Sequence, residues 1–462
     1  MVTGGSGRIA DVFRLEEPLG RRAYAEIGCT LMALKYLVEA AVIWLATDRF
    51  YQPLDFLNPL LSVRGKYFDP PAPGWLGWAV VVWSLPFLCI ATTMSVRRAV
   101  DAGLGPWPGL WMFAPGINFL IMIVLCLSPK RPWPVVRSPE EATRGVDPIR
   151  SMLAGMALGS TFGLAMLALS VYGLRDYGAG LFMGTPLVVA AIAAYVDNRS
   201  ARRSLGRSLV VAQAALLLCG GFLILLAFEG IVCLVMLYPI AGAMGIVGGL
   251  VGHAIARLGP DRPATIVAPL VMLPLLMGAE RLVRTVPTYE VRTAIEIDAT
   301  PEAVWPHVVG FSTLTAPPAW YFRLGIAYPL RATIDGSGVG AVRRCEFSTG
   351  PFIEPITAWE PGRRLAFDVA SQPPPMHELS PYRHIHPPHL DGYLRCRRGE
   401  FRLITIPGGR TRLEGSTWYE YEIYPQAYWT LWSDMLIQRI HRRVLDHIRR
   451  ESERPPETAP GP

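Results

Sequence analysis

Histidines concentrate beyond residue 285 of this 462-residue chain, where seven of the eight lie. Three of them, His384, His386 and His389, fall within one short stretch, with Asp391 close behind. Because imidazole is a common zinc ligand, these three are the candidate metal ligands. A Pro-Pro pair inside the stretch makes it an extended loop, however, and its spacing matches no known metal motif. The sequence therefore predicts no bound metal, and a loop whose imidazoles hydrogen-bond to backbone.

Glutamates offer a second kind of chemistry, because a cyclase needs a general base near an enolisable ligand. The acids in question are Glu346, Glu354, Glu378, Glu400 and Glu414. Glu346 and Glu400 each precede a phenylalanine that is expected to face inward, so strand alternation turns both acids toward solvent. Glu354 stands between Ile353 and Pro355 and is the first acid to examine, so the candidate catalytic residues are Glu354, His386 and His389.

Aromatic side chains are the candidates for contact with an apolar ligand. The set is Trp305, Trp418, Tyr428, Trp429 and Trp432. Aromatic rings in a small domain usually fill its core, but Tyr and Trp also present a polar tip to a ligand. The two roles coincide where the wall of a cavity is also the core of the domain.

The elements that would position these residues lie in the last 180 residues. Val291, Thr293, Ile295 and Ile297 alternate with polar residues, which predicts a half-buried strand. A short helix from Pro301 follows, and then strands at 340–349, 353–359, 364–370, 399–406 and 411–423. Residues 427–450 carry an apolar stripe that predicts a long amphipathic helix. This order predicts an α+β domain over 285–453, an antiparallel sheet wrapped on the last helix, with a disordered tail at 454–462.

Four stretches of this domain follow the pattern of a known superfamily. They are Ala-Thr-Pro-Glu-Ala-Val-Trp at 299–305 after the opening strand, the Gly-rich stretch and strand at 336–350, Trp-Glu-Pro at 359–361, and the Trp-bearing last helix. Together they resemble the START-related SRPBCC superfamily, the helix-grip fold of polyketide cyclase/dehydrase-like proteins. The resemblance implies an apolar cavity between the sheet and the last helix, which would hold a lipid, polyketide or other hydrophobic molecule. It supplies no catalytic residue.

The first 284 residues are of a different kind, because their apolar residues gather in long runs. The chain is 51% hydrophobic and 18% charged, and a membrane span needs roughly twenty apolar residues. Such runs lie at 27–47, 75–94, 108–127, 152–174, 179–196, 208–228 and 231–254, and an eighth at 264–279 is short and holds two prolines. The sequence predicts a multi-pass α-helical membrane region of seven or eight spans, about three of them in a first domain, 1–145, and four to five in a second, 146–284.

The first of these domains carries a recognisable arginine-rich turn. It is formed by Arg97, Arg98, Asp101, Gly103 and Trp107, and a Gly-Arg-Arg-Ala-Tyr sequence stands upstream at 20–24. On these motifs residues 20–130 resemble a family of small bacterial inner-membrane proteins that has no assigned chemistry. The residue types suit a turn at the membrane interface, with the tryptophan at headgroup level.

The net charge, one pair of charged residues and a repeat of small residues indicate which other partners and functions are expected. The net charge of +7 is small for this length and lies between apolar segments, so it indicates membrane topology and not nucleic-acid binding. Lys35 and Glu39, one turn apart in the first span, are expected to form a structural ion pair. Gly155, Gly159 and Gly163 repeat every four residues, a pattern of close helix packing that would also serve a homo-oligomer.

The side of the membrane on which the C-terminal domain lies stays open. Arg-rich loops at 130–150 and 199–207 indicate the cytoplasmic side. Counting spans through 264–279 then places the domain outside. If that segment lies in the interface instead, the domain is cytoplasmic.

The sequence thus favours a protein of the bacterial inner membrane whose C-terminal domain binds a hydrophobic ligand, with no cofactor. Its expected partners are membrane lipids and a hydrophobic small molecule, and not nucleic acid. A first alternative is an enzyme of cyclase or dehydratase type with a His or Glu base in the same cavity. A second is a structural or assembly protein without a ligand.

Overall fold

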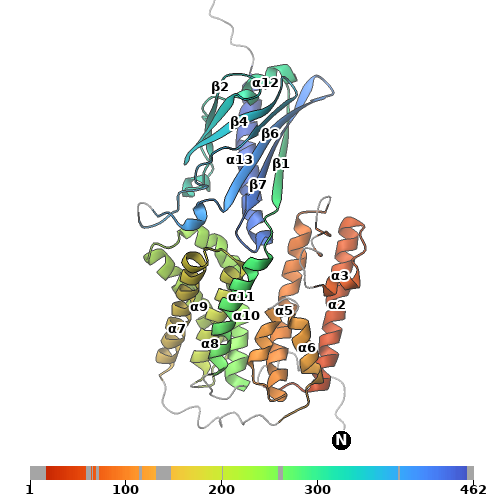
Figure 1. Ribbon diagram of the computed structural model, residues 1–462, viewed down its shortest axis with the longest axis vertical. Coiled ribbons are helices and arrows are strands. Elements are labelled where there is room, and N and C mark those ends of the chain that lie inside the picture. Colours follow the sequence, from red (N-terminus) through yellow and green to blue (C-terminus); the bar gives the residue numbers. More distant parts are fainter. Residues whose placement is uncertain are drawn as a thin grey trace, which may run out of the picture. The chain divides into compact units, whose positions relative to one another are not determined.

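A computed structural model describes residues 17–58, 64, 66–68, 72–113, 117–131, 147–199, 201–258, 264–382 and 385–454 (Figure 1). The chain divides into two compact units. The first, called the helical unit below, comprises Met1–Leu174, Gly180–Gly221 and Tyr238–Leu282. The second, the C-terminal unit, comprises Arg175–Ala179, Phe222–Leu237 and Val283–Pro462. The C-terminal unit therefore includes two short segments from the helix-rich half of the sequence.

The helix-rich half of the sequence forms long apolar helices. They are α2 (Arg21–Thr47), α5 (Trp75–Asp101), α7 (Pro148–Leu167), α8 (Thr185–Arg199), α9 (Leu205–Leu225) and α10 (Ile231–Leu258). The π-helical turns η3 (Ala168–Gly173) and η4 (Gly180–Gly184) extend α7 and precede α8. Shorter helices are α3 (Pro53–Leu57), η1 (Trp107–Phe113), α6 (Ile117–Leu127), α11 (Ala264–Glu280) and η5 (Arg281–Val283).

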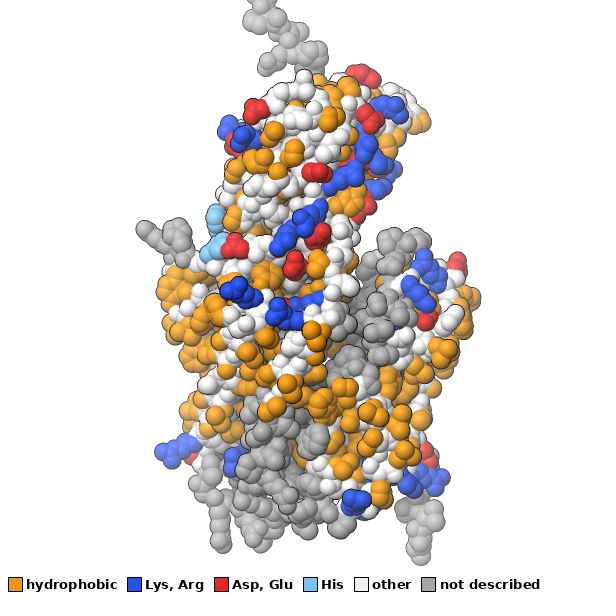
Figure 2. Space-filling view, in the orientation of Figure 1, with side chains coloured by type: hydrophobic (Ala, Val, Ile, Leu, Met, Phe, Trp, Pro, Cys, Tyr) orange, Lys and Arg blue, Asp and Glu red, His pale blue; other side chains and the backbone are white. Residues whose placement is uncertain are grey.

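Six helices in the described part of the chain are long and apolar enough to cross a membrane. The predicted count of seven or eight spans is not confirmed, because the described helices in the two remaining stretches, η1, α6 and α11, are shorter. With 11 residues, α6 rises only about 16 Å, roughly half the thickness of the hydrocarbon core. Large apolar side chains such as Leu45 and Leu217 are 80% and 60% exposed on these helices, and Figure 2 shows hydrophobic side chains over the visible face of this unit. A bilayer would cover such a surface.

Small residues let the helices approach closely within the chain. A Cβ added at Gly155 would stand 2.6 Å from the backbone oxygen of Ala193 in α8, and one at Gly163 would stand 2.8 Å from the Cys219 sulfur in α9. The small-residue face predicted from the repeat is thus occupied by helices of the same chain. The homo-oligomer stays a prediction.

The arginine-rich turn has a structural role that its residue types do not reveal. Arg98 is buried within the helical unit. Its guanidinium donates to the backbone oxygens of Leu125, at 3.0 Å, and of Ser128, and to Asp101 at 2.7 Å. The last carbonyls of a helix have no partner inside it, so Arg98 caps the end of α6.

The expected ion pair of the first span is present, and it has further partners. Lys35 donates to Glu39, whose side chain is 1% exposed. Arg64 lies 3.5 Å from the same carboxylate and Ser84 donates to it at 3.3 Å. Glu39 Oε1 thus has two hydrogen-bond donors, and Lys35 and Arg64 compensate the charge, as expected of a structural ion pair.

The C-terminal unit contains an antiparallel sheet of seven strands and one long helix. The strands are β1 (Thr288–Ile297), β2 (Pro329–Asp335), β3 (Val342–Phe347), β4 (Gly350–Glu360), β5 (Arg364–Asp368), β6 (Leu394–Ile406) and β7 (Arg410–Tyr421). The helices are α12 (Pro301–Val309), the short η6 (Phe322–Leu324) and η7 (Pro388–Leu390), and α13 (Gln426–Ser452). The strands lie in the order β1-β7-β6-β5-β4-β3-β2, with α13 against the sheet (Figure 1). This is the predicted α+β architecture.

The core of this unit lies between the sheet and the second half of α13. Val444, Leu445 and Ile448 of the helix pack with buried residues of the strands and of α12. Those partners include Ile297, Leu365, Leu403, Leu413, Val304 and Val308. The apolar stripe of α13 is therefore the surface that the sheet wraps, as its spacing predicts.

Strand β2 has no counterpart among the predicted strands. It begins at Pro329 and lies at the edge of the sheet, where β3 is its neighbour strand and Phe311 forms an isolated bridge with Ala332 on its other side. Proline has no backbone N–H to donate, which confines it to such edge positions and weakens the strand pattern.

The outer face of the sheet carries pairs of arginine and glutamate. Glu400 accepts hydrogen bonds from Arg364, Arg398 and Arg402, and it is only 3% exposed. It faces outward as predicted, but the arginine side chains cover it. Blue side chains cross the visible face of this domain in Figure 2.

Candidate functional site

Arg343 and Glu354 form an ion pair inside the C-terminal unit. They stand directly opposite each other on β3 and β4, and the Arg343 guanidinium donates to the Glu354 carboxylate. Arg343 is 2% exposed and Glu354 is 5% exposed. Strand alternation explains the direction, since Arg343 and Cys345 are buried while Arg344 between them is exposed. The structure thus places the predicted catalytic acid in the interior of the domain, beside an arginine.

Three phenylalanine rings surround the Arg343 guanidinium. Its central carbon lies 5.6 Å from the ring centre of Phe311, 5.2 Å from that of Phe367 and 5.7 Å from that of Phe401. Its Nε donates to the backbone oxygen of Val309 at 3.2 Å. Aromatic faces attract a cation, and they do so more strongly away from water. The charge is therefore held in an apolar interior by rings, one carbonyl and one carboxylate.

Burial raises the pKa of three titratable side chains in this interior. Burial raises the pKa of Glu354 above its ordinary value, although the Arg343 guanidinium opposes that shift. Burial, with a smaller contribution from Glu354, raises the pKa of Cys345 and of Cys396 to about 12. Both thiols therefore stay protonated near neutral pH and are poor nucleophiles. The groups available for chemistry are a carboxyl that can hold a proton and a guanidinium that can bind an oxygen atom.

Three of the predicted ligand-contacting aromatic residues come together at the start of α13. The ring of Tyr428 lies 5.2 Å from that of Trp429 and 6.5 Å from that of Trp432, centre to centre. The Tyr428 hydroxyl donates to the backbone oxygen of Met236 in the first turns of α10. The indole N–H of Trp432 is buried without a hydrogen-bond partner among the described residues. A buried donor without a partner costs free energy that a ligand oxygen would recover.

The other two predicted aromatic residues lie elsewhere. Trp418 on β7 stands between Thr417 and Tyr419, which both hydrogen-bond to α13, so strand alternation turns it to the outer face. There its ring lies 4.8 Å from the Arg398 guanidinium. Trp305 on α12 packs against Trp359 at 5.6 Å beside the core. The expectation that Trp418 lines the interior is therefore corrected.

A buried histidine holds the middle of α13 to the sheet. One ring nitrogen of His441 lies 2.8 Å from the Thr417 hydroxyl on β7, and the other lies 3.1 Å from the Thr293 hydroxyl on β1. Burial lowers the pKa of His441 to about 4. The folded unit therefore keeps this imidazole neutral at pH values where a solvated one is protonated.

His441 gives the unit a pH dependence with a definite sign. In the unfolded chain its imidazole takes up a proton near pH 6.5, whereas in the folded unit it does so only near pH 4. Stability should therefore fall by roughly 3 kcal/mol as the pH drops from about 6.5 to about 4, and it should be unaffected above that window. His441→Gln keeps a hydrogen-bonding group without a titration, so its unfolding midpoint should depend less on pH over that range. The exposed His377, changed to Gln, is the control, and equal slopes for His441→Gln and the wild type would contradict the assignment.

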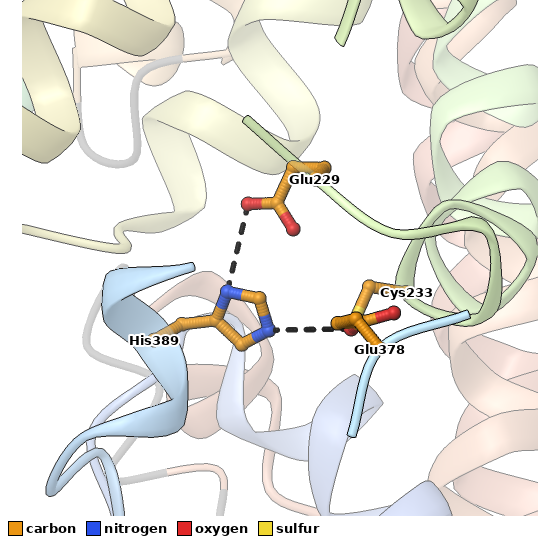
Figure 3. Close-up of side chains that lie close together, drawn as sticks. All are labelled: Glu229, Cys233, Glu378 and His389. Atoms are coloured by element: carbon orange, nitrogen blue, oxygen red, sulfur yellow. Dashed lines mark hydrogen bonds and ion pairs between the residues drawn. The ribbon is translucent and has the colours of Figure 1, made fainter. Parts of the chain in front are cut away.

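A second polar cluster lies within the C-terminal unit, formed by Glu229, Cys233, Glu378 and His389 (Figure 3). One donor atom from each of the four side chains lies within 4.8 Å of the others. His389 Nε2 is 3.2 Å from the Cys233 sulfur and 3.9 Å from the Glu378 carboxylate. His389 Nδ1 is 3.5 Å from the Glu229 carboxylate. The residue types are those of a transition-metal site.

Separate segments supply this cluster. Glu229 stands in the turn between α9 and α10, and Cys233 lies in the first turn of α10. Glu378 comes from the segment between β5 and β6, and His389 from η7 in the same segment. Burial lowers the pKa of His389, but the Glu229 and Glu378 carboxylates outweigh this and raise it above its ordinary value. Burial raises the pKa of Glu378.

The three histidines singled out in the sequence do not share one set of partners. His386 pairs with Asp391 at 2.8 Å, and both side chains are more than half exposed. His389 joins the cluster described above, and His384 lies outside the described residues. The partners of His386 and His389 are carboxylates and a thiol, not the backbone groups that were expected.

The order of strands and the helix that the sheet wraps define the C-terminal unit as a helix-grip domain. Similar solved structures include the Zhui aromatase/cyclase from Streptomyces sp. R1128, with 16% identity and a TM-score of 0.26 over 36% of this chain and 95% of that one. Truncated norcoclaurine synthase from Thalictrum flavum shows 10% identity and a TM-score of 0.24 over 36% and 94%. The protein XoxI from Bacillus cereus shows 15% identity and a TM-score of 0.24 over 35% and 93%. No protein-family model and no curated protein matches the chain.

Proposed function

We propose that this protein is a multi-pass protein of the bacterial inner membrane whose helix-grip domain binds a hydrophobic ligand between the sheet and α13. The observation that carries the proposal is the ion pair of Arg343 and Glu354 in an otherwise apolar interior. Replacing a buried ion pair by apolar residues is often neutral or stabilising by about 1–4 kcal/mol. A fold with no ligand to recognise would gain little from keeping such a pair.

The surroundings of the pair suit an amphipathic ligand of the lipid, isoprenoid or polyketide type. The rings of Phe311, Phe367 and Phe401 supply apolar contact around the guanidinium. Arg343 and Glu354 supply a donor and an acceptor for one oxygen-bearing group of the ligand. A few polar groups in an apolar wall fix the orientation of a ligand in this way.

The aromatic group at the start of α13 suits an entrance for such a ligand. Tyr428 contacts Met236 of α10, so these rings lie at the end of a helix that is apolar enough to span a membrane. A lipid-like molecule has a very low free concentration in water, because its apolar surface partitions into the bilayer. Tethering the domain to the membrane keeps it next to the source of its ligand.

An enzyme of cyclase or dehydratase type is the second candidate, and one observation favours it. Glu354 is a buried carboxyl whose pKa is raised by burial, which is the environment of many general acids and bases. His386 and His389 lie in the segment between β5 and β6 and not in this interior, so Glu354 would be the base. Glu354→Gln distinguishes the two functions. An enzyme with this substitution would still bind its substrate but would no longer convert it, whereas a carrier would lose affinity for its ligand.

The test is native mass spectrometry of the full-length protein in detergent, with extraction of small molecules that co-purify. The full chain is needed because 285–453 alone lacks Glu229 and Cys233 of the C-terminal unit. We expect one hydrophobic molecule per chain in the wild type, and an occupancy at least about tenfold lower in Arg343→Met and in Trp432→Leu, the effect of roughly 1.4 kcal/mol. Trp320→Leu is the matched control, because Trp320 is 72% exposed in the same domain.

Equal occupancy in the wild type and in a folded Arg343→Met variant would refute the role of the ion pair. A wild-type protein that carries nothing beyond the bulk lipid bound by every variant would refute ligand binding. That result would leave the structural or assembly role.

A further inference from the structure

The Glu229, Cys233, Glu378 and His389 cluster is not used by the function proposed above, and its polar groups are poorly satisfied. Glu229 Oε2 and Glu378 Oε2 are buried without a hydrogen-bond partner, and the nearest partner of His389 Nδ1 among the described residues is the Glu229 carboxylate at 3.5 Å. Among the described residues no lysine or arginine forms an ion pair with either carboxylate. The two carboxylates and the thiol, when all are ionised, carry more negative charge than a protonated His389 can balance. A bound cation would compensate it.

We propose that this cluster is a binding site for one Zn²⁺ ion, held by the Cys233 thiolate, the Glu378 carboxylate and His389 Nε2. The ligand atoms of a tetrahedral zinc site lie roughly 3.3–3.8 Å apart, as follows from bond lengths of about 2.0–2.3 Å. The sulfur lies 3.2 Å and the Glu378 oxygen 3.9 Å from Nε2. The sulfur and Glu378 Oε1 lie 2.5 Å apart, so these two atoms must separate by about 1 Å to bind one ion. Thiolate and imidazole favour zinc over magnesium and calcium, which prefer oxygen ligands.

Glu229 has a different role, because it faces the other nitrogen of the same ring. Its carboxylate lies 3.5 Å from His389 Nδ1 (Figure 3). A carboxylate that accepts from one ring nitrogen fixes the tautomer that leaves the lone pair of the other for the metal. Glu229 is therefore a positioning residue. Three protein ligands leave the fourth position of the ion to water or to an external ligand.

Gly230 is part of the same arrangement. A Cβ at this position would stand 1.8 Å from Glu378 Oε2. Only glycine therefore allows the Glu378 carboxylate to reach the turn that carries Glu229 and precedes Cys233. Zinc at this place would join the α9–α10 turn to the segment between β5 and β6, two stretches that are separated by 145 residues between Cys233 and Glu378.

The experiment loads the full-length protein, freed of metal with a chelator, with Zn²⁺ or Co²⁺ in detergent. We expect one Zn²⁺ per chain by elemental analysis, and with Co²⁺ a sulfur-to-cobalt charge-transfer band in the near ultraviolet. Cys233→Ser should abolish that band. Glu378→Gln and Gly230→Ala should lower the affinity about 100-fold or more, and Glu229→Gln about 10- to 100-fold, the usual effect of losing an outer partner.

Two variants serve as matched controls. Cys29→Ser removes an exposed thiol outside the cluster, and His386→Gln removes an exposed imidazole of the same loop; both should bind like the wild type. The proposal is overturned if the wild-type chain takes up no stoichiometric metal, or if the cobalt band persists in Cys233→Ser. Because the band reports the thiolate directly, the wild type alone decides the matter should a variant fail to fold. Ligand occupancy is measured separately, so a failure here leaves the proposed function intact.

Discussion

Replacing Arg343 by methionine is expected to destabilise the helix-grip domain by about 3–5 kcal/mol, the usual cost of removing one partner of a buried ion pair. The substitution keeps an unbranched side chain between the rings of Phe311, Phe367 and Phe401. It leaves the Glu354 carboxylate buried opposite a thioether, without the cation that compensates it. The midpoint of domain unfolding, followed by tryptophan fluorescence of the full chain in detergent, measures the loss.

The pH dependence of this variant provides an internal check. Without Arg343, the Glu354 carboxyl loses the one contribution that lowers its pKa, so its folded pKa rises further above that of the unfolded chain. A raised carboxyl pKa makes the folded state relatively more stable at low pH, where the group is protonated in both states. The deficit of Arg343→Met should therefore shrink as the pH falls toward the ordinary pKa of glutamate and grow as the pH rises.

The double variant Arg343→Met/Glu354→Leu separates the ion pair from simple packing. With both charges gone, the interior is apolar throughout, and most of the lost stability should return. Arg331→Met is the matched control, because Arg331 pairs with Glu346 across β2 and β3 in the same geometry but on the exposed face. Its unfolding midpoint should barely move. A double variant as unstable as the single one would show that the guanidinium acts through its shape and not its charge.

The sequence predicts the helix-grip domain well where local patterns are long. The stripe at 427–450 predicts α13, which runs from Gln426 to Ser452, because an apolar face spaced over several turns leaves little choice of structure. The strands β3 to β7 have counterparts for the same reason. By contrast, β2 is a short edge strand that opens with Pro329, and its pattern is too weak to predict.

Prediction of the candidate sites from the sequence is limited for a different reason. The apolar neighbours Ile353 and Pro355 single out Glu354 as an acid to examine. Its partner Arg343, however, stands at an inward position of a strand, where an arginine is not expected. His389 is recognisable as a possible ligand, but Cys233 is 156 residues away in an apolar helix, where a thiol looks like a small hydrophobic side chain. Contacts over such separations depend on the tertiary fold and leave no local pattern in the sequence.

The second large effect on stability is expected from replacing a glycine of α10, in the helical unit. Gly245 and Gly249, four residues apart, face α9: added Cβ atoms would meet Leu216 at 2.4 Å and Ala212 at 3.1 Å. A second pair faces α8. A Cβ at Gly248 would stand 2.1 Å from the backbone oxygen of Leu187, and one at Gly252 would stand 2.3 Å from that of Ala191. Two glycine faces on one helix let α10 pack closely on two neighbours at once.

Gly248→Ala is therefore expected to destabilise the helical unit by about 3 kcal/mol or more, at the upper end of overpacking effects, because the obstacle is backbone and cannot change rotamer. Gly221→Ala makes the same change in α9 at a site where a Cβ meets nothing within 4 Å. It should leave the thermal midpoint unchanged or raise it slightly, since alanine favours a helix over glycine. Thermal unfolding of both variants in detergent, beside the wild type, measures the difference. If Gly248→Ala unfolds at the wild-type temperature, α8 and α10 are not in backbone contact, and the glycines of α10 are then free to pack against a second copy of the chain.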